Sequence, residues 1–332
     1  MTGLQVGLAA MLEQFHPAEV LDLAGYAESR GFSGVMASDH FQPWVPQQGE
    51  SSFVWNVLSA LGERTAGDLG PVAVPTFRWH PAMIAQASAT LAAMNPGRHW
   101  LGISSGEAIN EHITAQYWPE APERINRMFE AVDIIKKLFT ASLADRDVKH
   151  AGAFYKLEST RLWTMPAEPP EILVTTAGPV TAKRAGRTVD GLITVAAPLE
   201  KIAGLFARFD EGAREVGKDP SRSSKVLQLH LSWASTDEEA VANALREWPN
   251  GAMKFPKSDI RSPYEFEQIA KLVRPEDFAG RLLVSSDTDL HRASIQRYVD
   301  LGFDRIYLHN VGRNQREFID VFARDVLPGL VR

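Results

Sequence analysis

Short apolar runs alternate with longer amphipathic segments along most of this 332-residue chain. Residues 4–11 are almost continuously apolar, which is typical of a strand buried on both faces. Residues 17–30 then have apolar positions at helical spacing and end before Gly31, a residue that favours a helix C-terminus. The same alternation recurs to the end of the chain. The predicted strands are 4–11, 34–38, 70–74, 99–104, 172–176, 191–195, 226–234 and 305–309, and the predicted helices are 17–30, 55–65, 81–94, 124–139, 178–187, 202–216, 237–248, 294–301 and 315–326.

Regular alternation of strands and helices predicts a parallel sheet. Roughly eight strand–helix units in a chain of this length fit a closed (β/α)8 TIM barrel better than an open doubly wound sheet. No Gly-x-Gly-x-x-Gly motif follows the first strand, which argues against a Rossmann domain. Three segments interrupt the pattern: 41–54, 148–157, which looks like a hairpin, and 250–272. We interpret them as insertions after strands, which carry specificity in barrel enzymes, and expect one domain over residues 1–332.

Composition narrows the class of protein further. The net charge of −6 argues against nucleic acid as a partner, since that would need a basic face. The absence of cysteine excludes disulfides, iron–sulfur clusters and thiolate zinc sites. The N-terminus has no pattern of a secretory signal, and no apolar stretch reaches the roughly 18 residues of a membrane span. We therefore expect a cytoplasmic protein that acts on a small molecule and not on a membrane.

Polar residues that end the predicted strands are the candidates for chemistry, because a barrel's active site lies at the C-terminal ends of its strands. Asp39 and His40 end the second strand. A histidine can exchange a proton near neutral pH while a neighbouring carboxylate orients it; a structural pair in a loop is the alternative. Glu107 follows the fourth strand, as a second proton-transfer group or as a carboxylate at a helix N-terminus. Glu13 lies near the end of the first strand.

Two turns of small residues, 104–106 and 177–181, could bind a phosphate with their backbone N–H groups. Together they suggest a cofactor that carries phosphate. No metal site is expected, because the nine histidines are scattered and no His-Glu-x-x-His motif is present. The Gly-x-Ser-x-Gly motif of a nucleophilic triad is also absent. Trp44 lies in a predicted loop, where it would either wall an aromatic pocket or join the core.

Several longer motifs coincide with these strand ends. They are Glu13-Gln14-Phe15, Ser38-Asp39-His40-Phe41-Gln42-Pro43-Trp44, Pro75-Thr76-Phe77-Arg78, Gly106-Glu107-Ala108-Ile109-Asn110-Glu111, Ala177-Gly178-Pro179 and Asp190-Gly191. In these motifs the chain resembles the coenzyme F420-dependent glucose-6-phosphate dehydrogenases, a family of the luciferase-like superfamily of flavin and deazaflavin oxidoreductases. The resemblance runs from the first strand to the last helix and implies a luciferase-like barrel.

The resemblance implies roles for individual residues. His40 would take the proton from a substrate hydroxyl, and hydride would pass to C5 of the deazaflavin. Glu107 would act as an acid or charge stabiliser near the ring, while Trp44 and Glu13 would hold the substrate. The family's non-proline cis peptide falls within residues 72–74. The residues implied to contact the cofactor are Asp39, Val72, Ala73, Val74, Thr76, Ser104, Ser105, Gly106, Asn110, Ala177, Gly178 and Pro179.

The family holds its substrate phosphate with three cations, and this chain matches only part of that set. Lys257 and Arg281 are the counterparts of two of them. The third falls in residues 195–198, which contain no lysine, although Lys201 is close in sequence. A missing phosphate contact would weaken binding by about 1.5–3 kcal/mol. The substrate is therefore expected to be sugar-like, with or without a phosphate.

The cofactor has an alternative as well. Segments 110–114, 229–233 and 305–315 resemble a subgroup of the family that is suspected to use an ordinary flavin. Reduced FMN can activate oxygen, whereas a deazaflavin passes hydride and reacts poorly with oxygen.

The leading hypothesis is an oxidoreductase that passes hydride from a hydroxyl-bearing, sugar or sugar-phosphate-like substrate to coenzyme F420. The alternatives are an FMN-dependent oxidoreductase or monooxygenase with a flavin reductase as partner, and a non-catalytic flavin-binding barrel. A cofactor-free lyase would need a lysine or a metal at a strand end, and neither is found. The resemblance also implies a homodimer.

Overall fold

The apolar runs form the strands of one parallel sheet that closes on itself. The computed structural model describes residues 3–331, and the strands run in the order β3-β2-β1-β12-β10-β9-β8-β5-β4, with β11 paired to β10. Strands β3 and β4 flank Ala73, and Leu69 of β3 also bridges to His99 just before β5, so the two ends of the order meet. Taking β3 and β4 as one position and setting β11 aside leaves eight positions, which confirms the predicted (β/α)8 barrel. The barrel strands are β1 Gln5–Ala10, β2 Gly34–Ser38, β3 Asp68–Val72, β4 Val74–Pro75, β5 Trp100–Ser104, β8 Glu171–Thr175, β9 Gly191–Val195, β10 Ser224–Ser232 and β12 Arg305–Asn310.

The barrel interior is filled by two large aromatic side chains. Trp100 and Tyr307 are buried with their rings 5.7 Å apart, and Trp100 Nε1 donates a hydrogen bond to Tyr307 Oη at 3.2 Å. Tyr307 Oη donates in turn to Asp68. Glycines on the neighbouring strands provide the space: a Cβ on Gly7 would lie 2.7 Å from the Tyr307 ring, and one on Gly70 would overlap the ring of Trp100. The bottom of the barrel is therefore a filled core and not a channel.

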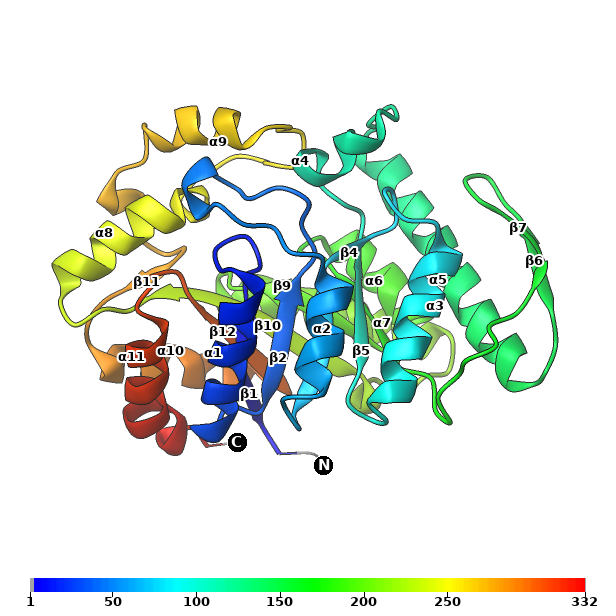
Figure 1. Ribbon diagram of the computed structural model, residues 1–332, viewed down its shortest axis with the longest axis horizontal. Helices are drawn as coiled ribbons and strands as arrows, with labels where there is room; N and C mark the ends of the chain where they lie inside the picture. The colour runs from blue at the N-terminus through cyan, green and yellow to red at the C-terminus, as the bar shows by residue number, and fades with distance from the viewer. Residues whose placement is uncertain (1–2, 332) are drawn as a thin grey trace.

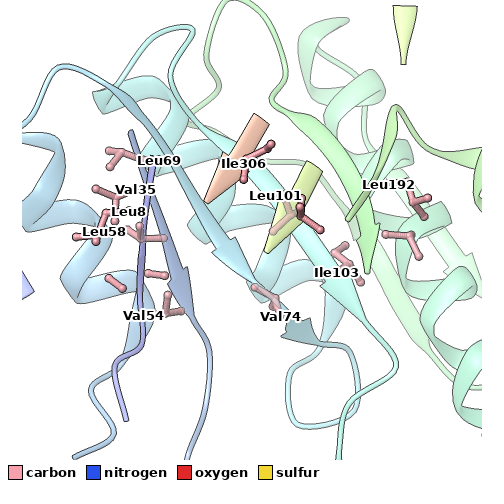
Figure 2. Close-up of a cluster of buried hydrophobic side chains, with 14 of the residues drawn as sticks. Leu8, Val35, Val54, Leu58, Leu69, Val74, Leu101, Ile103, Leu192 and Ile306 are labelled. Atoms are coloured by element: carbon pink, nitrogen blue, oxygen red, sulfur yellow. The ribbon is translucent and has the colours of Figure 1, made fainter. Parts of the chain in front are cut away.

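Helices cover the outer face of the barrel (Figure 1). Their apolar stripes meet the outward side chains of the strands; Figure 2 shows Val35 and Leu69, paired across β2 and β3, beside Leu58 of α2. Asp287 caps α10 by accepting hydrogen bonds from two backbone N–H groups, and Gly302 ends the same helix with φ of 105°. The covering helices are α1 Pro17–Ser29, α2 Val54–Gly62, α3 Pro81–Met94, α5 Ala121–Leu143, α6 Pro179–Thr188, α7 Leu199–Glu215, α8 Asp237–Glu247, α10 Thr288–Leu301 and α11 Gln315–Val321, which continues as a π-helix, Phe322–Val326.

The added segments differ in part from their prediction. The hairpin of β6 Val148–Ala151 and β7 Lys156–Thr160 follows helix α5, so its interpretation as an insertion after a strand is wrong. The carboxylate of Glu130 on α5 holds its turn by accepting from the N–H groups of residues 153–155. Segment 250–272 contains a helix that the pattern did not predict, α9 Pro263–Ala270; Ser262 caps its N-terminus and Pro263 occupies its first position. Two short elements, α4 Ala108–Glu111 and β11 Leu283–Val284, complete the chain.

The third predicted strand, residues 70–74, is divided by a cis peptide between Val72 and Ala73, as the resemblance implied. No helix within residues 3–331 is long and apolar enough to cross a membrane. One domain over 1–332 stays a prediction, and residues 1, 2 and 332 of that span lie outside the described residues.

Candidate active site

A cavity of about 1150 Å³ opens at the C-terminal ends of the strands. In Figure 1 the chain termini lie at the opposite end of the barrel, and α4 and α9 lie above the strand ends. The backbone of Ala108 at the start of α4 donates to the carbonyl of Ser258, so segment 250–272 is fixed to the segment after β5. The predicted residues that line this cavity are Glu13, Asp39, His40, Trp44, Val72, Ala73, Ser104, Ser105, Gly106, Glu107, Asn110, Ala177, Lys257 and Arg281.

His40 lies between two carboxylates in the wall of the cavity. Its Nδ1 is 3.2 Å from Glu13 Oε1 and 3.4 Å from the carbonyl oxygen of Gln42, and its Nε2 is 3.9 Å from Glu107 Oε2. The Gln42 carbonyl oxygen and an ionised Glu13 carboxylate can only accept hydrogen bonds. His40 Nδ1 therefore carries the ring hydrogen. Nε2 of the neutral ring is therefore the basic nitrogen, and it faces Glu107.

Glu13 is positioned by the neighbouring strand. Ser38 Oγ donates to Glu13 Oε2 at 2.5 Å and accepts from the backbone N–H of Leu12 at 2.9 Å. Parallel pairing of β1 with β2 brings these two strand ends together. The buried Glu13 carboxylate is thus held by one fixed hydroxyl, and its other oxygen, which has no hydrogen-bond partner among residues 3–331, faces His40 Nδ1.

Glu107 begins the segment that leads into α4 and keeps 37% of its side-chain surface exposed, on the cavity side. Burial against the wall raises the pKa of its carboxyl group, while the charges of His40 and Lys257 act in the opposite direction. A raised pKa favours the protonated carboxyl, which can donate a proton as well as accept one.

Trp44 forms the aromatic wall next to His40, with ring centroids 5.0 Å apart. Edge contacts with Phe266 of α9 at 5.2 Å and Trp248 at 6.4 Å fix the indole on its other sides. Its backbone N–H donates to Gln48 Oε1 at 2.8 Å, and the amide nitrogen of Gln48 donates to the carbonyl of Glu247. The 41–54 segment is thereby attached to the end of α8.

Asp39 takes part in an ionic cluster that the sequence did not predict. Arg78 Nη2 lies 3.3 Å from Asp39 Oδ1, and the backbone N–H of Arg78 donates to Glu111 Oε2 at 2.7 Å. Burial raises the pKa of Asp39, opposed by Arg78, and raises the pKa of Glu111 to about 8. One guanidinium thus faces two buried carboxyl groups. Both Arg78 and Glu111 stand in the quoted motifs, but nothing in their spacing indicated that they meet.

The turn after β5 supports the cis peptide and bends sharply. Ser104 Oγ donates to the carbonyl of Ala73 at 3.0 Å and accepts from the N–H of Gly106. Gly106 has φ of 80°, a conformation that favours glycine, and a Cβ there would lie 2.9 Å from Glu111 Cγ. Asn110 has a structural task, because its side-chain oxygen accepts from the N–H groups of Phe41 and Gln42.

Four predicted cofactor residues do not line the cavity. Val74 is fully buried in the core, and the carbonyl of Thr76 accepts the hydroxyl hydrogen of Tyr155. Gly178 and Pro179 begin helix α6, one residue beyond the lining residue Ala177.

The wall fits a planar ring that carries polar edge groups. Asp39 Oδ2 is buried in the wall and has no hydrogen-bond partner among residues 3–331, so it can accept from a bound N–H group. Ala73, whose carbonyl accepts from Ser104, and Gly106 add small residues to the same wall. These residues therefore fit a flavin or deazaflavin ring.

Five cationic side chains line the cavity: Arg124, Lys201, Lys254, Lys257 and Arg281. Lys257 Nζ donates to the carbonyl of Asn250 at 2.8 Å and lies 5.9 Å from the centre of the Trp44 ring. Burial lowers the pKa of Lys257, aided by the charge of Arg281, while Glu107 opposes the change. Lys201 and Lys254 also line the cavity. Lys201 therefore lines the cavity although it lies beyond residues 195–198, where the resemblance places the third cation. Lys254 was not anticipated, because a lysine in a surface loop has no distinguishing pattern.

His230 was not among the candidate residues, yet it lines the cavity. Its ring lies 4.8 Å from Trp248, which also lines the cavity. His230 stands in segment 229–233, whose resemblance to a family subgroup implied no site role for it, and Trp248 belongs to no quoted motif. The alternation of β10, which sends every second side chain inward, is the signal that could have indicated His230.

The barrel and the cavity at its strand ends agree with a family model described as luciferase-like monooxygenase, which matches residues 2–305. The chain belongs to this family, and the predicted membership is confirmed.

Within the family, the chain is similar to particular enzymes. It is 38% identical over 335 residues to the F420-dependent glucose-6-phosphate dehydrogenase of Intrasporangium calvum, covering 98% of this chain and 99% of the relative. The enzyme of the same name from Microbacterium testaceum is 35% identical, covering 98% and 97%. Among solved structures, an F420-dependent secondary alcohol dehydrogenase in complex with an F420-acetone adduct has a TM-score of 0.93 at 29% identity, with full coverage of both chains.

Proposed function

We propose that the protein is an F420-dependent oxidoreductase that oxidises a hydroxyl-bearing, sugar or sugar-phosphate-like substrate. The observation that carries the proposal is His40, whose basic Nε2 faces the cavity between Glu13 and Glu107. The names of the similar enzymes support coenzyme F420 as the cofactor. They also support a dehydrogenase as the reaction type.

His40 acts as the general base in this proposal. Its Nε2 takes the proton of the substrate hydroxyl, and Glu13 stabilises the resulting imidazolium through Nδ1 at 3.2 Å. This proton transfer leaves the carbinol carbon free to lose hydride as the carbonyl forms. Glu107, with its raised pKa, supplies or holds a proton beside the ring. Trp44 covers the reacting atoms and excludes water from one side of His40.

Coenzyme F420, when bound, supplies the hydride acceptor. Asp39, Ala73 and the turn 104–106 would hold its ring, because they line the cavity together and Asp39 supplies a carboxylate oxygen that has no hydrogen-bond partner among residues 3–331. Ala177 at the entrance to α6 would lie toward its phosphate. Retention of both His40 and Glu107 in the cavity weighs against a non-catalytic flavin-binding barrel.

A sugar phosphate is the substrate that the cations favour. Lys257, Arg281, Lys201 and Lys254 all reach the same cavity as His40, and phosphate binding needs such a set of donors. The relatives named glucose-6-phosphate dehydrogenase support the same choice. A homodimer and a cytoplasmic location stay predictions.

Titration of the purified protein with coenzyme F420 and, separately, with FMN tests the proposal, with the fluorescence of each cofactor as the readout. We expect saturable binding of F420 at micromolar concentration and much weaker binding of FMN. Binding of FMN alone would contradict the proposal and favour the FMN-dependent oxidoreductase or monooxygenase with its flavin reductase. Binding of neither would contradict both.

A further inference from the structure

We propose that His230 selects substrates with a second hydroxyl group, which donates a hydrogen bond to His230 Nε2. The inference rests on the proposed function and assigns to His230 the recognition of a substrate hydroxyl group other than the one oxidised. It follows from a chain of hydrogen bonds, Val311–Gln14–His309–His230, that fixes which nitrogen of each ring carries the hydrogen.

The chain starts at an amide whose orientation is determined. Gln14 Nε2 donates to the carbonyl of Val311 at 3.0 Å, so the other terminal atom of that side chain, Oε1, is an acceptor. This oxygen lies 2.6 Å from His309 Nε2. An amide oxygen cannot donate, and therefore His309 Nε2 carries a hydrogen.

The same logic extends to His230. Nδ1 of His309 lies 2.8 Å from Nδ1 of His230, and one of the two must donate to the other. A neutral imidazole has a single hydrogen, which His309 carries on Nε2, so His309 Nδ1 accepts and His230 Nδ1 donates. Burial lowers the pKa of both rings, that of His230 to about 3, which keeps both neutral. His230 Nε2 is therefore left with a lone pair.

That lone pair belongs to a ring in the cavity wall. No residue in the described part of the chain hydrogen-bonds to His230 Nε2, and the ring lines the cavity. Trp248 lies against the ring at 4.8 Å and in turn contacts Trp44, which contacts His40. His230 thus stands at one end of an aromatic wall whose other end is the proposed base.

The charges around His230 give its lone pair a distinct role. Lys257, whose positive charge lowers the pKa of His230, offers only donors, as does Arg281 beside it. Those cations suit phosphate oxygens, which accept. A lone pair repels such oxygens and binds a hydroxyl hydrogen, so His230 requires a donor group on the substrate away from the oxidised carbon.

Adjacent residues of one loop orient both histidines. Glu13 contacts His40, and Gln14, the next residue, contacts His309 and through it His230. The backbone of Gln14 is itself held by Arg313, which donates to its carbonyl at 3.1 Å. The loop after β1 therefore sets a base at one place in the cavity and an acceptor at another.

The hydrogen positions can be tested without cofactor or substrate. In protein with 15N-labelled histidine, long-range 15N–1H spectra should show His230 hydrogenated on Nδ1 and His309 on Nε2. A His309→Gln variant identifies the His230 signals. The opposite tautomer, or a doubly protonated His230 at neutral pH, would overturn the proposal.

Kinetics test the selection itself. With F420 as acceptor, the rates of cofactor reduction by hexane-1,5-diol and hexan-2-ol, which differ only in a hydroxyl group four carbons from the oxidised one, are compared, with glucose 6-phosphate as a further probe. Wild type should prefer the diol over the mono-alcohol by roughly 3- to 10-fold in kcat/KM, the effect of one hydrogen bond. His230→Phe should abolish this preference through KM, and His230→Gln, which keeps an acceptor oxygen, should retain part of it.

The possible failures are distinguishable. An unchanged preference in His230→Phe, with cofactor reduction intact, overturns the role of His230 alone. A loss of preference that His230→Gln does not restore also overturns it, because any disturbance of the wall would do the same. Absence of F420 reduction with all three probes overturns the proposed function instead.

Discussion

His40 combines contacts from three separate segments of the chain: Glu13 after β1, Gln42 in its own loop, and Glu107 after β5. Nε2 is the basic nitrogen because the hydrogen-bond acceptors near Nδ1, Glu13 and the Gln42 carbonyl, keep the ring hydrogen on Nδ1. A base role therefore depends on this arrangement, which makes it testable by substitution.

Replacing the imidazole should separate binding from turnover. His40→Ala should lower kcat by roughly 100-fold or more, the usual contribution of a general base, while the Kd for F420 stays within a factor of about two. His150→Ala, which removes a histidine of the outer hairpin paired with Glu130, serves as the control and should keep kcat. Unchanged turnover in His40→Ala would rule out the base.

Glu111 should affect how stability depends on pH. Its pKa in the folded protein is about 8, above the ordinary 4.5, because it is buried, and Arg78, Asp39 and Glu107 modify the value. Between these two pH values the folded protein holds a proton that the unfolded chain releases, so stability falls as pH rises, by at most about 1.4 kcal/mol per pH unit. Above pH 8 this contribution is lost.

Glu111→Gln should remove that slope. Urea unfolding at pH 5, 6, 7 and 8 should show wild type losing more stability than the variant across the range, since the amide cannot titrate. Parallel curves for the two proteins would mean that Glu111 is ionised in the folded state.

At this scale the sequence predicted His40, Glu107, Glu13 and Trp44, because each follows a strand end or stands in a recognisable motif. Arg78, Glu111 and His230 were missed as functional candidates. Their significance arises from contacts across the barrel, such as the Nδ1–Nδ1 pair that joins residues 79 positions apart, and no local pattern encodes such a contact.

Among the elements, segment 250–272 matters most to the substrate proposal. It carries Lys257 into the cavity, and its helix α9 supports Trp44 through Phe266. The sequence predicted an insertion here but not the helix, since an 8-residue helix with one buried aromatic gives little periodicity. The hairpin was predicted from its pattern. Its attachment to α5 was not predicted, because it depends on Glu130.

Substitution within this segment should distinguish substrates with and without phosphate. Lys257→Met should raise KM for glucose 6-phosphate by roughly 10-fold or more, as for a lost hydrogen bond to a charged group, and change KM for glucose little. Lys271→Met is the matched control, because the ammonium group of that exposed lysine donates to Gln268. Equal effects on both substrates would contradict a phosphate contact.

For the whole molecule, the barrel was predictable because strand and helix periodicities alternate so regularly. Closure through β3 and β4 follows from pairings on both sides of Ala73, which the sequence does not reveal. The filled interior below the cavity depends on matching large and small residues across strands, and that complementarity is a property of the closed sheet.

Gly70→Ala tests the filled interior. The added methyl group would overlap the Trp100 ring, so we expect a loss of about 1–3 kcal/mol in the free energy of unfolding. Gly25→Ala, in helix α1 with open space around its Cβ position, should be neutral or stabilising by up to about 1 kcal/mol. Equal stability of both variants in urea titrations would indicate a loosely filled barrel.

The central claim is that hydride passes from a substrate carbon to the deazaflavin while His40 takes the hydroxyl proton. The most direct measurement uses a substrate deuterated at the carbon to be oxidised, such as 1-deuterated glucose 6-phosphate, and mass spectrometry of the cofactor after one turnover. We predict one deuterium in the reduced cofactor and none in the solvent, with a reaction that needs no oxygen. Reduced cofactor without deuterium, or a product that forms only with oxygen and FMN, would contradict the account.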